Sequence, residues 1–127
     1  MKIVIADDSE MLRERIKNSL DDIEGVEIVG EAANGNEAIK IIQEKNPDFV
    51  ILDIRMPELN GIEVLKKLKE SKSKPIICIF TNYPYSQYKQ KCMEEGAEYF
   101  FDKNVNFQEI KNVIKEIAQK QGGVSDG

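Results

Sequence analysis

The stretch 47–57 constrains the fold of this chain more than any other. Between Pro47 and Pro57, the residues Phe49 to Leu52 form an unbroken apolar run that ends abruptly on the carboxylate of Asp53. A short apolar run of this kind is typical of a strand buried on both faces of a parallel sheet. Because burial disfavours a charged carboxylate, we expect Asp53 at the carboxyl end of that strand. In open parallel α/β sheets, ligands collect at this edge.

Short apolar runs alternate with amphipathic segments along the rest of the chain. Strands are expected at residues 2–6, 26–31, 49–52, 75–80 and 98–102, and helices at 9–22, 34–45, from 60, 84–95 and from 106. Capping boxes are predicted where an asparagine precedes a glutamate by three residues, at Asn34, Asn60 and Asn106. The alternation predicts an α/β domain with a parallel sheet and helices on both faces. We place this domain at 1–120, followed by a flexible tail at 121–127.

Composition narrows the range of functions. The length of 127 residues predicts one domain, and the formal net charge of −5 opposes direct nucleic-acid binding. The sequence has no histidine, which excludes a His-based metal site or general base. Cys78 and Cys92 lack the spacing of a zinc site and predict free thiols in a reducing cytoplasm. Apolar runs are too short for a signal peptide or a membrane span, so no membrane association is expected.

Polar residues terminate four of the expected strands. The first strand ends at Asp7 and Asp8, the third at Asp53, the fourth at Thr81 and the fifth at Lys103. Because parallel strands bring their carboxyl ends to one edge, these side chains are expected to lie together. Crowded carboxylates repel one another and need a cation at neutral pH.

This set of groups suits phosphoryl transfer onto a carboxylate. Oxygen ligands without His or thiolate favour Mg²⁺, with Mn²⁺ as an alternative, and the backbone carbonyl of Arg55 could complete the ligand set. Asp53 would attack phosphorus as the nucleophile. Lys103 and the hydroxyl of Thr81 would neutralise the charge that develops on the phosphoryl oxygens.

The segment from Lys2 to about Lys120 resembles the receiver domain of bacterial two-component response regulators. The matching residues are Asp7-Asp8, Asp53 with Met56-Pro57 and Gly61, Thr81, Gly96-Ala97 and Lys103. The resemblance implies a (βα)5 doubly wound, flavodoxin-like (CheY-like) fold with strand order 2-1-3-4-5. It further implies a phosphorelay switch that is not a conventional enzyme, although it catalyses its own phosphorylation and a slow autodephosphorylation.

The resemblance also assigns roles to residues. Asp53 would accept a phosphoryl group from a histidine kinase or phosphotransfer protein, and Mg²⁺ would be held by Asp7, Asp8 and Asp53. Thr81 would move to meet the phosphoryl group. Phe100 falls at the family's aromatic switch position, and its neighbour Tyr99 should face the other way. The fourth helix, fifth strand and fifth helix would form the output face for a target protein or a second copy.

Some positions depart from the family pattern. Asn104 follows the lysine, where the family usually has proline, commonly in a cis bond. The loop into the fifth helix is expected to be less rigid, since a cis bond without proline costs about 2.5–4 kcal/mol. Asn82 and then Tyr83 follow the threonine, where a small residue is usual. With Met56 and Arg55, they flank the site, and we hypothesise that Arg55, Asn82 and Tyr83 exclude water and lengthen the life of the aspartyl phosphate.

Simpler roles exist for each residue taken alone. Asp7 and Asp8 could cap the first helix, and Thr81 could be a turn residue. Lys103 could be a solvated surface charge, and Phe100 could pack at the sheet edge. The conjunction of the carboxylates with the lysine at matched strand ends favours the functional interpretation over these.

Two rival functions come from other classes. A phosphatase with an aspartate nucleophile usually has Asp-x-Asp after the first strand, whereas this chain has Asp7-Asp8-Ser9. A fragment of a transcription factor is the other possibility, because the sequence from Val26 to Ala38 resembles receivers that precede helix-turn-helix domains.

Overall fold

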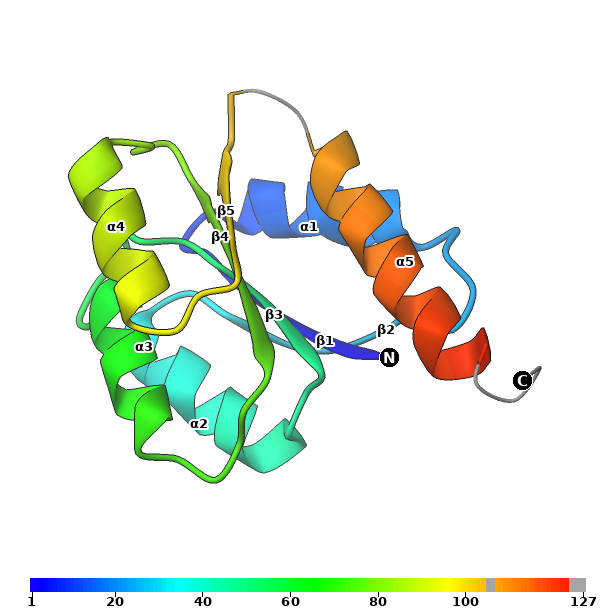
Figure 1. Cartoon of the computed structure of the whole chain (residues 1–127), viewed down its shortest axis with the longest axis horizontal. Helices are drawn as coiled ribbons and strands as arrows, with labels where there is room; N and C mark the ends of the chain where they lie inside the picture. The colour runs from blue at the N-terminus through cyan, green and yellow to red at the C-terminus, as the bar shows by residue number, and fades with distance from the viewer. Residues whose placement is uncertain (105–106, 124–127) are drawn as a thin grey trace.

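A computed structural model describes residues 1–104 and 107–123, which form a five-stranded parallel sheet with helices on both faces (Figure 1). The strands are β1 (Lys2–Ala6), β2 (Glu27–Ala32), β3 (Phe49–Leu52), β4 (Ile76–Thr81) and β5 (Tyr99–Asp102). The helices are α1 (Glu10–Leu20), α2 (Gly35–Lys45), α3 (Gly61–Lys69), α4 (Ser86–Glu94) and α5 (Gln108–Gly123). The strand order β2-β1-β3-β4-β5 confirms the expected fold.

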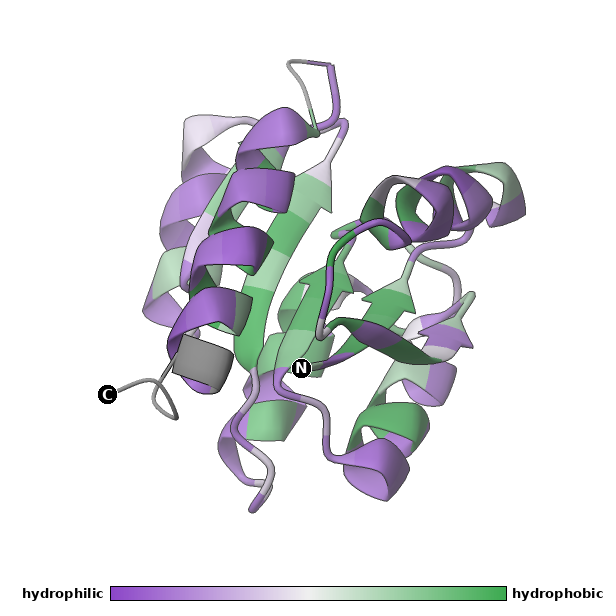
Figure 2. Ribbon diagram, turned by 90° about the vertical axis from the view of Figure 1, so that its right-hand side faces the viewer, coloured by the Kyte–Doolittle hydropathy of each residue, from purple (hydrophilic) through white to green (hydrophobic). Residues whose placement is uncertain are grey.

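The core lies in two apolar layers, one on each face of the sheet. Alternate residues of β1 point to opposite faces, so Val4 joins the layer under α2, α3 and α4 while Ile5 joins the layer under α1 and α5. Every residue of β3 is buried, as expected for a central strand covered on both sides. Figure 2 shows apolar strands between helices whose outer surfaces are hydrophilic.

Helix boundaries follow local capping chemistry. At α3, Asn60 Oδ1 accepts from the Glu63 N–H at 2.9 Å and Glu63 Oε1 accepts from the Asn60 N–H at 3.1 Å, which confirms that capping box. At α2, Asn34 caps the Glu37 N–H, but the Glu37 carboxylate accepts from the Ala33 N–H rather than from that of Asn34, so the predicted capping box is only half formed. The third predicted cap, at Asn106, lies outside the described residues.

Two expected boundaries require correction. Helix α4 begins at Ser86 rather than near Pro84. Helix α5 continues to Gly123, so residues 121–123 are helical and the boundary expected at 120 was too early. Residues 124–127 lie outside the described part. Among the described residues, no helix combines the length and apolar character that a bilayer crossing requires.

Candidate functional site

The sheet ladder continues one residue past three strand ends and fixes the backbone of the site there. The N–H of Asp7 donates to the Ala32 carbonyl at 2.9 Å, that of Asp53 to Ala6 at 3.0 Å and that of Lys103 to Thr81 at 2.8 Å. These hydrogen bonds hold the backbone of each residue at the carboxyl edge of the sheet. The sequence predicted this convergence from the order of polar residues after apolar runs, and the structure brings the side chains together.

Lys103 reaches from β5 to both inner carboxylates. Its Nζ donates to Asp7 Oδ2 at 2.6 Å and to Asp53 Oδ2 at 2.9 Å. The side chains are largely buried, with exposed fractions of 11% for Lys103, 4% for Asp7 and 6% for Asp53. Because water screens such buried charges poorly, the Coulomb attraction between Lys103 and each carboxylate is stronger than that of an ion pair on the surface.

Three carboxylates meet in this pocket. One oxygen from each of Asp7, Asp8 and Asp53 lies within 4.8 Å of the others, with Asp8 on the exposed side. The remaining oxygen of Asp7, Oδ1, accepts from the Ser9 N–H at 2.8 Å. In contrast, Asp53 Oδ1 is buried and has no hydrogen-bond partner among the described residues. A buried carboxylate oxygen without a donor is costly, and a divalent cation bound by oxygens fits this arrangement.

The electrostatics of the pocket reflect burial and crowding. Burial raises the pKa of Asp53 and the nearby Asp7 carboxylate raises it further, which together outweigh the opposing effect of Lys103. Burial alone would lower the pKa of Lys103, but its hydrogen bonds to Asp7 and Asp53 outweigh burial and raise it. One ammonium facing three carboxylates leaves the pocket negative at neutral pH, which favours a cation.

The remaining residues singled out in the sequence lie around the pocket. Thr81 is fully buried at the end of β4, and its Oγ1 accepts from the Tyr83 N–H at 3.0 Å, so its own proton is available to another acceptor. The Arg55 guanidinium lies 4.4 Å from the Tyr83 ring centroid, while Asn82 is exposed. Met56 is half-buried against the layer under α2, α3 and α4.

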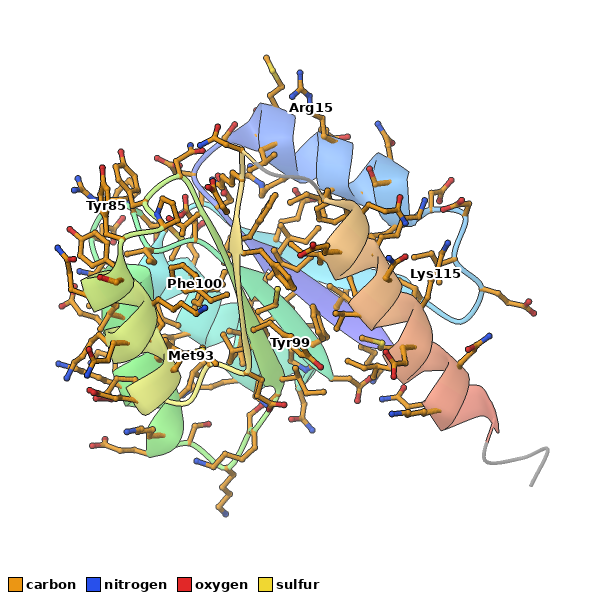
Figure 3. All side chains as sticks on the ribbon, turned by 45° about the horizontal axis from the view of Figure 1, so that its top comes forward. Arg15, Tyr85, Met93, Tyr99, Phe100 and Lys115 are labelled. Carbon is orange, nitrogen blue, oxygen red and sulfur yellow. The ribbon has the colours of Figure 1, made fainter. Side chains whose placement is uncertain are left out.

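Phe100 and Tyr99 lie on opposite faces of β5, as expected. Phe100 packs in the layer that includes α4, whereas Tyr99 packs in the layer that includes α5 (Figure 3). The Lys103–Asn104 bond is trans, and the Asn104 N–H donates to Asp102 Oδ1 at 2.8 Å. A local side-chain turn of this kind stabilises the start of the loop without proline.

The sequence interpretation missed Arg13 and Glu31. Arg13 on α1 donates from Nη1 to the backbone carbonyl of Asp7 and from Nε to Glu31 Oε1 on β2. A signal was available, because Arg13 lies one helical turn after the N-cap Ser9 and therefore faces the loop that carries the acidic pair.

Comparison with known proteins identifies the family. The model of the response regulator receiver domain matches residues 3–115. This chain belongs to the response regulator receiver family. Among curated relatives, the BvgA transcription regulator of Bordetella pertussis is 34% identical over 91% of this chain and 55% of its own length. The response regulator GacA of Pseudomonas aeruginosa is 29% identical over 98% of this chain and 58% of its own length. The receiver described here thus spans about half the length of these relatives.

Solved receiver structures share its fold. The receiver domain of the response regulator NarL from Mycobacterium tuberculosis has a TM-score of 0.85 and 25% identity, covering 93% of this chain and 95% of that one. A LuxR-family response regulator from Staphylococcus aureus has a TM-score of 0.84 and 29% identity, covering 92% and 98%. A CheX–CheY–BeF3–Mg complex from Borrelia burgdorferi has a TM-score of 0.82 and 25% identity, covering 92% and 88%.

Proposed function

We propose that this receiver is a phosphorylation-controlled switch in a two-component or phosphorelay system, with Asp53 as the phosphoacceptor. The observation that carries the proposal is the environment of Asp53. One of its oxygens is held by Lys103, and the other is buried beside two further carboxylates with no hydrogen-bond partner in the described part of the chain. The donor would be a histidine kinase or phosphotransfer protein.

In this proposal, an Asp53 carboxylate oxygen attacks phosphorus in line with the leaving group. The P–N bond of a donor phosphohistidine breaks, and its electron pair stays on the imidazole nitrogen. The Lys103 ammonium neutralises charge on the phosphoryl oxygens, and the Thr81 hydroxyl donates a hydrogen bond to one of them. Phosphorylation adds about −1.5 to −2 charges at Asp53, so Lys103 and Thr81 gain a new anionic partner.

A divalent cation completes the proposed site. Asp7, Asp8 and Asp53 would hold Mg²⁺, with Mn²⁺ as a substitute, and the Arg55 backbone carbonyl would be a further ligand. The bound cation would supply electrostatic stabilisation of the transferring phosphoryl group. The all-oxygen chemistry of these side chains and the unpartnered Asp53 oxygen support this choice.

The output is proposed to pass through α4, β5 and α5. Thr81 ends β4 and Phe100 lies on β5 facing α4, so reorientation of both residues would bias α4. A downstream target or a second copy of the chain would read this face. The acidic character of the chain argues against direct binding of nucleic acid by the receiver itself, and its two buried free thiols fit a cytoplasmic protein.

Intact-mass analysis after incubation with acetyl phosphate and Mg²⁺ tests the phosphoacceptor. A single phosphoryl adduct is expected in the wild type and in Asp48→Asn, a control carboxylate at the opposite end of β3. Asp53→Asn is expected to give no adduct. The proposal fails if the wild type stays unmodified or if Asp53→Asn is modified at the wild-type rate.

The residues that flank the pocket are proposed to lengthen the life of the aspartyl phosphate. The contact of Arg55 with the Tyr83 ring supports this idea, since the pair forms a cover beside the site. An exposed cation–π contact contributes roughly 0.5–1 kcal/mol, which corresponds to a rate change of about 2–5-fold. Tyr83→Ala should therefore accelerate dephosphorylation by that factor, and Tyr85→Ala should not. Equal rates for Tyr83→Ala and the wild type would remove the idea.

The two rival functions remain distinguishable. Repeated turnover of a small phosphate ester would indicate a phosphatase, although Ser9 occupies the acid/base position and its N–H binds Asp7. The longer curated relatives include proteins named transcription regulators. A reading frame that continues past Gly127 into a helix-turn-helix domain would support a corresponding role for the whole protein.

A further inference from the structure

The guanidinium of Arg13 connects three elements at the edge of the pocket. Nη1 donates to the backbone carbonyl of Asp7, and Nε donates to Glu31 Oε1 on β2 at 3.0 Å. The Arg13 side chain is only 13% exposed. A buried guanidinium with two fixed acceptors has a defined orientation, since its donors form a rigid planar fork.

Glu31 sets that orientation and carries the opposite charge. Its second oxygen, Oε2, accepts from Lys17 Nζ at 2.8 Å. Burial alone would raise the pKa of Glu31, but the hydrogen bonds from Lys17 and Arg13 outweigh burial and lower it, so the carboxylate stays ionised at neutral pH. Glu31 pairs with the guanidinium, and Arg13 contacts a neutral carbonyl of the pocket rather than a carboxylate of the acidic pair.

The carbonyl that Arg13 holds belongs to the peptide between Asp7 and Asp8. The other polar groups of Asp7 are also engaged, its N–H by Ala32, Oδ1 by Ser9 and Oδ2 by Lys103. The orientation of the peptide plane after Asp7 determines where the Asp8 side chain leaves the backbone. Asp8 is exposed and makes no side-chain hydrogen bond or ion pair with any residue that the structure describes, so this peptide is its main constraint.

We infer that Arg13, oriented by Glu31, is a positioning residue that fixes the Asp7–Asp8 peptide so that both carboxylates face a divalent cation. This inference rests on the proposed function, because it takes the acidic pocket as the cation site. Partners that orient metal ligands from outside typically change metal affinity by about 10–100-fold when they are removed.

A positioning role and a simple charge effect predict opposite changes in Mg²⁺ affinity when the Arg13 guanidinium is removed. Removing a positive charge near an acidic pocket should tighten Mg²⁺ binding through Coulomb attraction alone. Loss of positioning should weaken it instead. Arg15 provides a matched control, because it lies on the same helix, carries the same charge and projects into solvent away from the sheet (Figure 3).

The experiment measures the Mg²⁺ dissociation constant by NMR titration without any phosphodonor, together with the Tm of each metal-free protein. The variants are Arg13→Gln, Arg13→Lys, Glu31→Gln, the double variant Arg13→Gln/Glu31→Gln, and Arg15→Gln as control. Arg13→Gln should raise the dissociation constant about 10-fold, and Arg13→Lys should recover part of the loss. Arg15→Gln should bind as tightly as the wild type or more tightly.

Glu31→Gln should also weaken Mg²⁺ binding, but it should add no further loss when Arg13 is already glutamine, since Glu31 acts through Arg13. Lys17 still pairs with the partly exposed Glu31 carboxylate in Arg13→Gln, so this variant leaves no unpaired charge at Glu31 and is expected to fold. Unchanged or tighter Mg²⁺ binding by Arg13→Gln overturns the inference while leaving the proposed function intact. Failure of the wild type to bind Mg²⁺ overturns the proposed function itself.

Discussion

Helices α3 and α4 lie on the same face of the sheet and have the same length of nine residues, yet they are anchored differently. Helix α3 begins at a complete capping box and buries Val64, Leu65 and Leu68. Helix α4 begins after Tyr85, which supplies no side-chain cap, and Cys92 is its one buried residue among those described. Tyr85 itself is 55% exposed.

This difference indicates that α3 is a firmly anchored helix and that α4 is a weakly anchored one. The first residue of α3 packs against the backbone of Asp53, since the Gly61 N–H donates to the Ile54 carbonyl at 2.8 Å and a Cβ at Gly61 would lie 2.3 Å from the Asp53 carbonyl oxygen. Only glycine permits that approach. Helix α3 thus holds Asp53 in place, whereas the missing cap and the single buried residue described in α4 predict that this helix opens locally at lower cost than α3.

The largest expected effect is loss of core packing under α3. Leu65→Ala should lower the free energy of unfolding by about 3 kcal/mol, within the range for truncating a buried leucine. Cys92→Ala under α4 should cost about 1 kcal/mol, since it removes a single sulfur atom. Urea denaturation measures both values. Similar losses for the two variants would contradict the comparison.

Hydrogen exchange compares the helices without mutation. Amides near the middle of α4 should exchange about 10-fold faster than those of α3, which corresponds to a difference of about 1.4 kcal/mol in local opening. Beryllofluoride with Mg²⁺ should then alter exchange in α4 and leave α3 unchanged. Exchange that is equally slow in both helices would show that α4 is as firmly held as α3.

The pH dependence of stability tests whether α3 holds Asp53 in a site that disfavours its ionised form. The raised pKa of Asp53 means that its ionised form destabilises the fold, so stability is lost as pH rises from the unfolded pKa of about 3.9 through the folded value. At neutral pH without metal, Asp53→Asn should be more stable than the wild type by about 1 kcal/mol.

That advantage should shrink as pH falls through the raised pKa, because the wild-type carboxyl is then protonated as well. Thermal melts in EDTA across this pH range measure it, with Asp48→Asn as the surface control. A metal-free Asp53→Asn protein that melts below the wild type at neutral pH would refute the assigned direction.

The smallest effects concern the two helix caps. Asn60→Ala should destabilise the protein by about 1 kcal/mol because it removes the side-chain oxygen that accepts from the Glu63 N–H. Tyr85→Asn should stabilise it by about 0.5 kcal/mol, since a new cap on α4 is partly offset by loss of the Tyr85–Tyr88 ring contact. Chemical denaturation resolves both, and a destabilised Tyr85→Asn would indicate that the ring contact outweighs the cap.

The sequence predicted the features of the site that follow from the topology of the sheet. Asp7, Asp53 and Lys103 follow apolar runs, and parallel strands must bring such residues to one edge. The sequence did not predict the contacts that depend on side-chain conformation. The unpartnered Asp53 oxygen, the Tyr83 N–H on the Thr81 hydroxyl and the Arg13 contact with a carbonyl are set by rotamers that residue spacing does not specify. Residues 121–123 belong to α5, although the sequence placed them in a tail, because the last turn of this helix has no apolar residues to mark it.

The double engagement of Lys103 has a consequence for signal fidelity. Its charge is already balanced by Asp7 and Asp53 in the resting molecule, so free anions that diffuse into the pocket meet a cation with little unmatched attraction. In the proposed switch, a phosphoryl group bonded to Asp53 is different, since it adds charge at a point that cannot diffuse away. Under that proposal, the two ion pairs make Lys103 respond less to free phosphate than to a phosphoryl group attached to Asp53.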